Sequence, residues 1–327
     1  MNRIEAETII RQIADEIGLT DLSPFDHKKG YDAKLSRAVF EGNNVIFKIL
    51  PKTEEKRISN YLREAAACKI MTENVAGINI TDIITTGWHG DYFWLIRRYK
   101  DGEALSPYFS TDLGLFGYDE IQDKYLPKLK QILDRVNENL IKIRAIGPQN
   151  KHYAGFEHPR FETDLMKCNP QYIEKGFGIS LDNQIAYYDK CSDDYYLPEN
   201  LSYSISDLVP ANIIIGPKGD VILSDFEWFS YDHVLTDPVF LWLYLWKHPE
   251  FQEYWYESAI APISDQDLFR AAIIRHIICW YRNLYSPERD ITDKLLANRE
   301  LWKKHRWTKY LLAAGESFDA LMKVKQV

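Results

Sequence analysis

The sequence predicts an α+β protein of two unequal parts, a mixed strand-and-helix segment followed by a mainly helical one. Three observations lead to this prediction. Strand-like and helix-like segments alternate through the first hundred residues, the apolar periodicity beyond them is helical, and the 327-residue chain has the 46% hydrophobic and 27% charged composition of a folded globular protein. We therefore expect a first lobe of residues 1–100 and a second lobe of residues 101–327.

The first lobe is expected to combine a small β-sheet with helices. Its segments, in chain order, are a helix over 3–19, strands over 35–41 and 44–50, a helix over 54–72, and strands over 78–86 and 92–99. The turn Glu41-Gly42-Asn43-Asn44 joins the first two strands, and Gly and Asn can supply the positive φ that a tight hairpin needs.

The second lobe is expected to be helical with one exception. Apolar residues from Leu126 to Ile143 recur at helical spacing and predict a long helix. Two short apolar runs, 213–215 and 221–223, flank a Pro/Gly turn and predict a β-hairpin. If these runs pair antiparallel, the residues Asn212 and Asp225 that flank them emerge close together at the open end of the hairpin.

Oxygen-bearing side chains gather around this hairpin. Mg²⁺ prefers oxygen donors and is commonly held by one or two protein groups together with substrate phosphates, so Asn212 and Asp225 are candidate magnesium ligands. Asp207 lies five positions before Asn212 in a loop that contains Pro210, and its carboxylate could accept a hydroxyl proton. Each residue alone is typical of a turn or a cap, whereas the combination indicates phosphoryl transfer.

The run Asp207-Leu208-Val209-Pro210-Ala211-Asn212, the hairpin and then Ser224-Asp225-Phe226-Glu227 resemble the catalytic loop and metal-binding segment of the aminoglycoside phosphotransferase and choline kinase families. Thr236-Asp237-Pro238 is similar to the Asp-Pro stretch that follows in those families. The resemblance implies a two-lobed protein-kinase-like fold, with Asp207 as catalytic base and Asn212 and Asp225 as Mg²⁺ ligands. Glu227 is either an acid near the metal or a structural hydrogen-bonding group.

The first lobe is consistent with this resemblance. Lys48 lies in a strand that is apolar on both faces, and a buried ammonium needs an anionic partner. Glu64 on the following helix and nucleotide phosphates are the candidates, which is the lysine and glutamate order of the kinase fold. The resemblance implies that the adenine meets backbone groups around Arg98, Tyr99 and Lys100, just before the Gly102-Glu103 turn into the second lobe.

The phosphate-binding loop is less distinct in the sequence. Residues 30–39 occupy the expected place before the lysine strand, but they are not rich in glycine. Ser36 and its neighbouring backbone amides are the candidate phosphate contacts, as the resemblance to small-molecule kinases implies. The nucleotide is therefore expected to be ATP, with GTP as the other candidate.

The chain departs from the family pattern immediately before the catalytic aspartate. The family usually has His-Gly there, whereas this chain has Ile205-Ser206. Isoleucine fills space but forms no side-chain hydrogen bond. The leading hypothesis is an ATP-dependent transfer of the γ-phosphoryl group to a hydroxyl of a small molecule such as an aminoglycoside, an amino alcohol or a sugar. The alternative is a catalytically weak or silent kinase-like scaffold that binds nucleotide.

Charge narrows the partners and leaves the acceptor open. The net charge of −8 argues against nucleic acid as the main ligand, and no apolar run approaches the length of a membrane span. With no secretory signal, a cytoplasmic protein with reduced cysteines is expected. Between Phe156 and Asp207 there are ten acids and four bases. This stretch either binds a cationic acceptor, with nearby tyrosine rings, or is a solvated acidic helix face.

Overall fold

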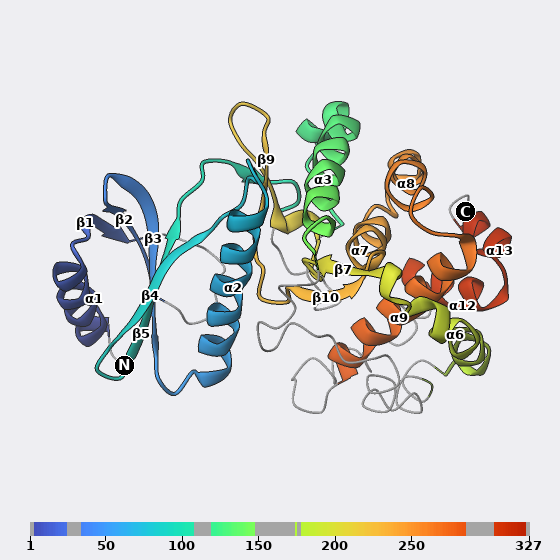
Figure 1. Cartoon of the computed structure of the whole chain (residues 1–327), viewed down its shortest axis with the longest axis horizontal. Coiled ribbons are helices and arrows are strands. Elements are labelled where there is room, and N and C mark those ends of the chain that lie inside the picture. The colour runs from blue at the N-terminus through green and yellow to red at the C-terminus, as the bar shows by residue number, and fades with distance from the viewer. Residues whose placement is uncertain are drawn as a thin grey trace. The chain divides into compact units, whose positions relative to one another are not determined.

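The computed structural model describes residues 3–24, 34–107, 119–147, 174, 178–285 and 304–324. The chain divides into two compact units (Figure 1). The first comprises Met1–Glu103 and Asn212–Phe229, and the second comprises Ala104–Ala211 and Ser230–Val327. The hairpin region Asn212–Phe229 thus packs with the N-terminal unit, although it lies beyond residue 100 in the sequence.

The first unit is built on a five-stranded antiparallel sheet in the order β1-β2-β3-β5-β4. The strands are β1 (Thr20–Pro24), β2 (Lys34–Phe40), β3 (Asn43–Pro51), β4 (Ile83–His89) and β5 (Tyr92–Arg98). Four of them were predicted, with β4 beginning later than expected. β1 was not, because the five residues Thr-Asp-Leu-Ser-Pro carry little strand propensity and form a strand by pairing with β2.

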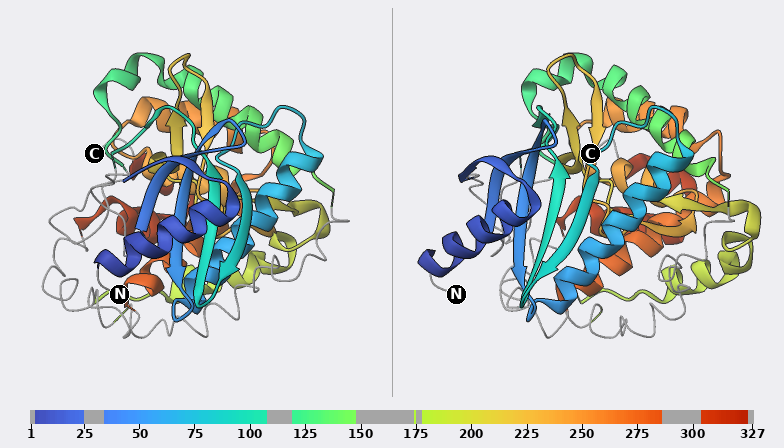
Figure 2. Two further views of the ribbon diagram at one scale, coloured as in Figure 1. Left: turned by 90° about the vertical axis from the view of Figure 1, so that its left-hand side faces the viewer. Right: turned by 60° about the vertical axis from the view of Figure 1, so that its left-hand side comes forward.

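The two faces of this sheet are covered by different helices (Figure 2). Helix α1 (Arg3–Ile17) places Ile10, Ile13 and Ala14 against one face, where Phe47 of β3 is buried. Helix α2 (Glu55–Asn74) covers the other face, where its Ile58 and Tyr61 pack with Leu50, Phe93 and Leu95. Because side chains alternate along a strand, Lys48 of β3 and Arg97 of β5 point to the α2 face.

The predicted hairpin between β2 and β3 is confirmed, but its turn uses different residues. Glu41 and Gly42 hold positive φ angles of 48° and 77°. Asn43 and Asn44 belong to β3 instead, where they pair with Phe40 and Val39. The turn is therefore the two-residue loop whose twist matches that of the flanking strands.

The second predicted hairpin is also confirmed. Strand β8 (Ile213–Ile215) pairs antiparallel with β9 (Val221–Leu223), with Ile213 opposite Leu223. Backbone hydrogen bonds link Leu223 to Asn79 and Thr81, each at 3.0 Å, so the hairpin is attached to the segment that follows α2. The short strand β6 (Glu103–Ala104) lies beside β8 in the same sheet.

The second unit is mainly helical, as predicted. Its helices are α3 (Leu129–Arg144), α6 (Asp182–Tyr195), α7 (Thr236–Tyr244), α8 (Pro249–Trp255), α9 (Gln266–Tyr285), α12 (Arg306–Glu316) and α13 (Phe318–Lys323). Short helical turns cover Asp123–Lys128, Pro198–Asn200, Pro210–Asn212 and Tyr256–Ile260. Every residue of α7 is buried, as expected for a central helix that is apolar on all sides.

Strands β7 (Leu201–Ser204) and β10 (Ser230–His233) form a two-stranded antiparallel sheet that was not predicted. Each strand has four residues and is largely polar, so neither shows the apolar alternation that identifies a strand. Ser204 pairs with Ser230, and the sheet frames the loop that carries Asp207. Within the described residues, no helix is both long and apolar enough to cross a membrane.

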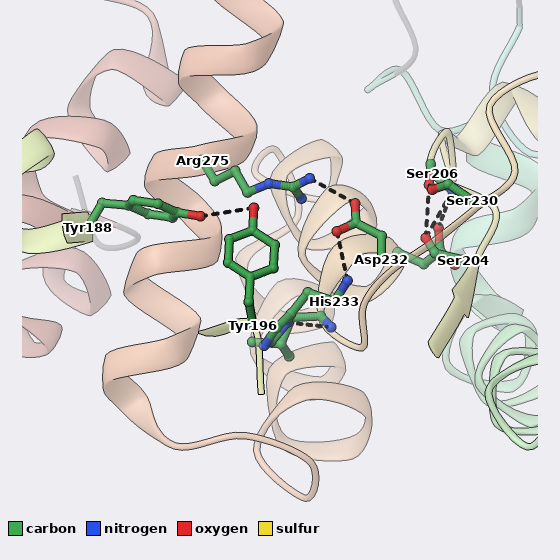
Figure 3. Close-up of polar contacts among 10 residues, drawn as sticks. Tyr188, Tyr196, Ser204, Ser206, Ser230, Asp232, His233 and Arg275 are labelled. Atoms are coloured by element: carbon green, nitrogen blue, oxygen red, sulfur yellow. Dashed lines mark hydrogen bonds and ion pairs between the residues drawn. The ribbon is translucent and has the colours of Figure 1, made fainter. Parts of the chain in front are cut away.

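A buried polar cluster stabilises the second unit around β10 (Figure 3). Arg275 of α9 donates a hydrogen bond of 2.9 Å to Asp232, and both side chains are almost fully buried. The ring of His233 stacks on Tyr195 at 3.7 Å, and its Nδ1 accepts the N–H of Leu235. The imidazole is therefore held neutral, with its proton on Nε2.

We expect His233 to make the protein sensitive to acid. Burial, aided by Arg275 and opposed by Asp232, lowers the pKa of His233 to about 3 from its usual 6.5. Because the unfolded chain binds this proton below pH 6.5 and the folded chain does not, stability is present above pH 6.5 and is lost as the pH falls toward 3. The loss is about 1.4 kcal/mol per pH unit.

The replacement His233→Gln isolates this contribution. Urea unfolding at pH 7, 6 and 5 should show the wild type losing stability more steeply than the variant, by about one proton's slope. Burial also raises the pKa of Asp237 to about 6, which acts in the opposite direction, but this contribution is common to both proteins. Parallel profiles for the two proteins would contradict the prediction.

Candidate functional site

In the first unit, Lys48 occupies the centre of a buried charged cluster. Its Nζ lies 4.0 Å from the centroid of the Tyr61 ring on α2, a cation–π contact. Burial, reinforced by the positive charge of Arg97, lowers the pKa of Lys48 to about 8 from 10.5, and the carboxylates of Glu227, Glu64 and Asp225 oppose this shift. A lysine whose ammonium is partly desolvated and faces carboxylates is well suited to meet an anion.

The predicted pairing of Glu64 with Lys48 is not what the structure shows. Glu64 is fully buried and forms its ion pair with Arg97, through Oε2 and a guanidinium N–H. Among the described residues no ion pair within 4.0 Å joins Lys48 to Glu64. Arg97 lies two residues after Leu95 on the α2 face of β5, so its guanidinium reaches the glutamate from the neighbouring strand.

Glu64 also connects α2 to the segment after β9. Its Oε1 accepts the backbone N–H of Phe226 at 3.3 Å, one residue beyond Asp225. Burial raises the pKa of Glu64 to about 7, and the positive charge of Arg97 opposes this rise. Asp225 adopts a φ of 66°, a left-handed conformation that costs a residue other than glycine some free energy. The contact between Glu64 and Phe226 helps to hold that conformation.

Two further carboxylates complete the cluster. Burial raises the pKa of Asp225, and Arg97 and Lys48 oppose the rise. Glu227 accepts a hydrogen bond of 3.1 Å from the side-chain amide of Asn60 on α2, and burial and Asp225 raise its pKa. Three carboxylates therefore share two cationic side chains, which leaves the site electrostatically ready for one more positive charge.

Asn212 lies at the open end of the hairpin, as predicted. Its carbonyl oxygen accepts hydrogen bonds of 3.0 Å from both the N–H and the hydroxyl of Ser224, the residue before Asp225. The amide and carboxylate oxygens of Asn212 and Asp225 are hard donors that suit Mg²⁺. In the described part of the chain, no three His, Cys, Asp or Glu side chains form a metal-binding group by themselves. The donor set thus fits an ion that takes its other ligands from a bound phosphate.

The segment expected to meet the nucleotide base has most of its amides engaged within the sheet. The N–H of Arg98 donates to Asp82 at 2.9 Å, and the N–H of Tyr99 donates to Asn44 at 3.0 Å. The Arg98 side chain bonds the Asp82 carboxylate. These two amides are therefore not available as donors to a base, whereas their carbonyl groups and the backbone of Lys100 are the remaining candidates.

Ser36 lies in the middle of β2, opposite Phe47, and is nearly buried. The preceding residues 25–33, which include most of the candidate phosphate loop, lie outside the described residues. The structure therefore places Ser36 in the sheet and not in a turn.

In the second unit, the loop of Asp207 follows β7 and is anchored from beneath by α7. The two carboxylate oxygens of Asp237 accept the N–H groups of Ile205 and Ser206, each at 2.8 Å. The Ile205 side chain is buried and occupies the place where the related families have histidine. Backbone contacts to Asp237 therefore hold a loop for which Ile205 offers no side-chain hydrogen bond.

The acidic stretch before Asp207 is only partly described, because residues 156–173 and 175–177 lie outside the described residues. Asp182, Asp189, Asp193 and Asp194 are exposed on α6. Two of the tyrosines considered for a cationic acceptor, Tyr188 and Tyr195, are buried in the core instead. The described part of the stretch has the character of a solvated acidic helix face.

Sequence reasoning missed Arg97, although its signal was present. Phe93 and Leu95 predict an inward face for β5, and continuing that alternation by two residues reaches Arg97. A buried strand that ends in a cation on its inward face indicates a buried anionic partner, which here is Glu64.

Comparison with solved structures reveals the same fold in small-molecule phosphotransferases. APH(2")-IIia, solved with GDP and kanamycin, has a TM-score of 0.62 at 12% identity, over 92% of this chain and 99% of that chain. Spectinomycin phosphotransferase APH(9)-Ia, solved with ADP and spectinomycin, has a TM-score of 0.60 at 10% identity, over 96% and 98%. Choline kinase LicA from Streptococcus pneumoniae has a TM-score of 0.53 at 14% identity, over 91% and 98%.

These likenesses confirm the predicted kinase-like α+β fold, which this chain shares with aminoglycoside phosphotransferases and choline kinase. The similarity is confined to structure. No protein-family model matches the sequence, and no curated protein matches it at the sequence level.

Proposed function

We propose that this chain, which has the fold of aminoglycoside phosphotransferases and choline kinase, is a kinase that transfers the γ-phosphoryl group of ATP or GTP to a hydroxyl of a small molecule. The observation that carries the proposal is the buried cluster of the first unit, in which Lys48, Glu64 and Asp225 interact beneath α2. A structural ion-pair network alone would pair Lys48 directly with one of these carboxylates, yet Lys48 keeps its charge for another anion.

Each residue of the cluster has a distinct proposed role. Lys48 binds the α- and β-phosphates, and Glu64, held by Arg97, fixes the backbone at Phe226 and so orients Asp225. Asn212 and Asp225 would hold Mg²⁺, which when bound neutralises phosphate charge that the protein alone does not balance. Transfer then depends mainly on positioning and electrostatics, because little covalent chemistry falls to the protein.

The remaining roles are proposed for residues that contact the two substrates. Asp207 orients the acceptor hydroxyl and takes its proton. The backbone of Arg98, Tyr99 and Lys100 meets the nucleotide base through carbonyl groups and the Lys100 amide, and Ser36 supports the phosphate-binding segment that precedes β2. The structural neighbours bind kanamycin, spectinomycin or choline, so amino sugars and amino alcohols are the first acceptors to examine.

The direct test is consumption of ATP or GTP with Mg²⁺ across a panel of aminoglycosides, amino alcohols, sugars and amines. Turnover that depends on one class of acceptor supports the proposal. Nucleotide binding without turnover on any acceptor supports the alternative, a kinase-like scaffold, which the buried Ile205 at the position before Ser206 favours. Absence of both binding and turnover would contradict both functions.

Asp225→Asn should remove the Mg²⁺ dependence of nucleotide binding. Because the substitution takes away a carboxylate ligand and leaves an amide of the same size, we expect the tenfold or greater gain in affinity that Mg²⁺ gives the wild type, about 1.4 kcal/mol, to disappear. Titration calorimetry with ATP in Mg²⁺ and in EDTA measures it for both proteins.

The fold should survive this substitution, since burial already raises the pKa of Asp225 and the neutral amide relieves a buried charge. A thermal melt provides the control. Equal Mg²⁺ dependence in wild type and variant would exclude Asp225 as a ligand.

A further inference from the structure

The loop before Asp207 contains a strained residue. Ser206 has a φ of 62°, in the left-handed region that side chains other than glycine rarely adopt. Such a conformation persists only where surrounding contacts over-determine it. The contacts at Ser206 therefore explain how the loop keeps its shape.

Three serine hydroxyls converge at this point (Figure 3). The Ser206 hydroxyl donates to Ser204 Oγ at 3.2 Å and lies 2.7 Å from Ser230 Oγ. Ser204 and Ser230 are register partners on β7 and β10, and both are almost fully buried. The Ser204 hydroxyl in turn bonds the Asp237 carboxylate.

The direction of this chain of hydrogen bonds follows from the fact that each hydroxyl has one proton. Asp237 as a carboxylate can only accept, so Ser204 donates to it. Ser206 then donates to Ser204, and Ser230 must donate to Ser206. All three donors point the same way and end on one buried carboxylate, an arrangement in which each bond strengthens the next.

We propose that Ser206, held by Ser204 and Ser230, is a positioning residue that fixes the backbone entering Asp207. The hydroxyl chain does by side-chain hydrogen bonds what Ile205 cannot, because it ties the strained residue to both strands of the β7–β10 sheet. This proposal rests on the proposed kinase activity for its catalytic consequence, whereas the anchoring of the loop does not depend on that activity.

Ser206→Gly separates positioning from stability. Glycine adopts the positive φ without strain, so its melting temperature should stay within about 2 °C of the wild type even though the hydroxyl is lost. The unanchored loop should nevertheless lower kcat about tenfold and leave KM for the nucleotide within twofold. A merely structural serine would not show this separation of kcat from stability and KM.

Ser230→Ala tests the same device from the other strand, with Ser202→Ala as matched control. Ser202 lies two residues before Ser204 on β7, is equally buried and bonds the Tyr203 carbonyl. We expect about a tenfold lower kcat for Ser230→Ala, no further loss in the Ser206→Gly, Ser230→Ala double variant, and wild-type kcat for Ser202→Ala. Unchanged kcat in Ser230→Ala, or an equal loss in Ser202→Ala, overturns the proposal.

Amide hydrogen exchange distinguishes failure of this proposal from failure of the proposed kinase activity. Exchange over residues 205–209 should be faster in Ser230→Ala and unchanged in Ser202→Ala, with no substrate required. If the wild type turns over no acceptor, the kinase activity is what has failed, and the exchange result still decides the anchoring. Equal exchange in Ser230→Ala and the wild type overturns the anchoring whatever the activity.

Discussion

Asp207→Ala should lower kcat by about three orders of magnitude while nucleotide affinity stays within about twofold of the wild type. General-base catalysis contributes 10²- to 10⁴-fold in enzymes, and a group that orients the acceptor acts on transfer and not on nucleotide binding. The loop that carries Asp207 is held by Asp237 through Ile205 and Ser206, so removing the Asp207 side chain leaves the anchoring contacts in place.

Steady-state kinetics on the acceptor found by the panel, combined with calorimetric titration of nucleotide, measure both quantities. Glu138→Ala is a suitable control because Glu138 is an exposed carboxylate on α3 in the same unit. We expect wild-type kcat for that variant. A kcat for Asp207→Ala within tenfold of the wild type would exclude Asp207 as the base, and a parallel loss of nucleotide affinity would indicate a disturbed loop instead.

Arg97→Met should be the most destabilising substitution in the first unit. Arg97 is the ion-pair partner of Glu64, which is fully buried, and it also opposes the raised pKa of Asp225. Removing one partner of a buried pair leaves an uncompensated charge and typically costs about 3–5 kcal/mol. We expect a loss of about 3 kcal/mol in the free energy of unfolding, because the Arg97 side chain is still 23% exposed.

The neighbouring residue offers a matched control. Arg98 pairs with Asp82 on the same strand, but both side chains are substantially exposed, so Arg98→Met should cost less than about 1 kcal/mol. The double variant Arg97→Met, Glu64→Gln should recover part of the loss, since glutamine keeps an acceptor for the Phe226 N–H without a buried charge. Urea unfolding measures all four proteins, and equal losses for Arg97→Met and Arg98→Met would contradict this account.

The parts of the fold that the sequence predicted are those with strong local signals. The turn around Gly42 and the apolar runs on either side of Gly216 specify hairpins by local chemistry, and the apolar stripe after Pro127 specifies α3. The strands of the β7–β10 sheet could not be found in this way. Their polar residues form strands because tertiary contacts, including the ion pair between Asp232 and Arg275, satisfy them.

The candidate site shows the same division. Asn212 lies where the hairpin register placed it, because antiparallel pairing fixes which residues flank the open end. The partner of Glu64 was mistaken for Lys48, since composition and order identify a buried anion without saying which of two nearby cations reaches it. The strained backbone at Ser206 and Asp225 leaves no mark in the sequence, as neither residue is glycine.

The grouping of Asn212–Phe229 with Met1–Glu103 has a practical consequence for dissecting the molecule. A fragment that stops at Glu103 would lack Leu223, whose backbone satisfies Asn79 and Thr81, and Phe226, whose N–H satisfies the buried Glu64. Such a truncation should be insoluble, whereas a rearranged gene that joins residue 103 through a short flexible linker to residues 212–229 should yield an autonomously folding nucleotide-binding fragment. Recombinant expression of the two products side by side would establish this.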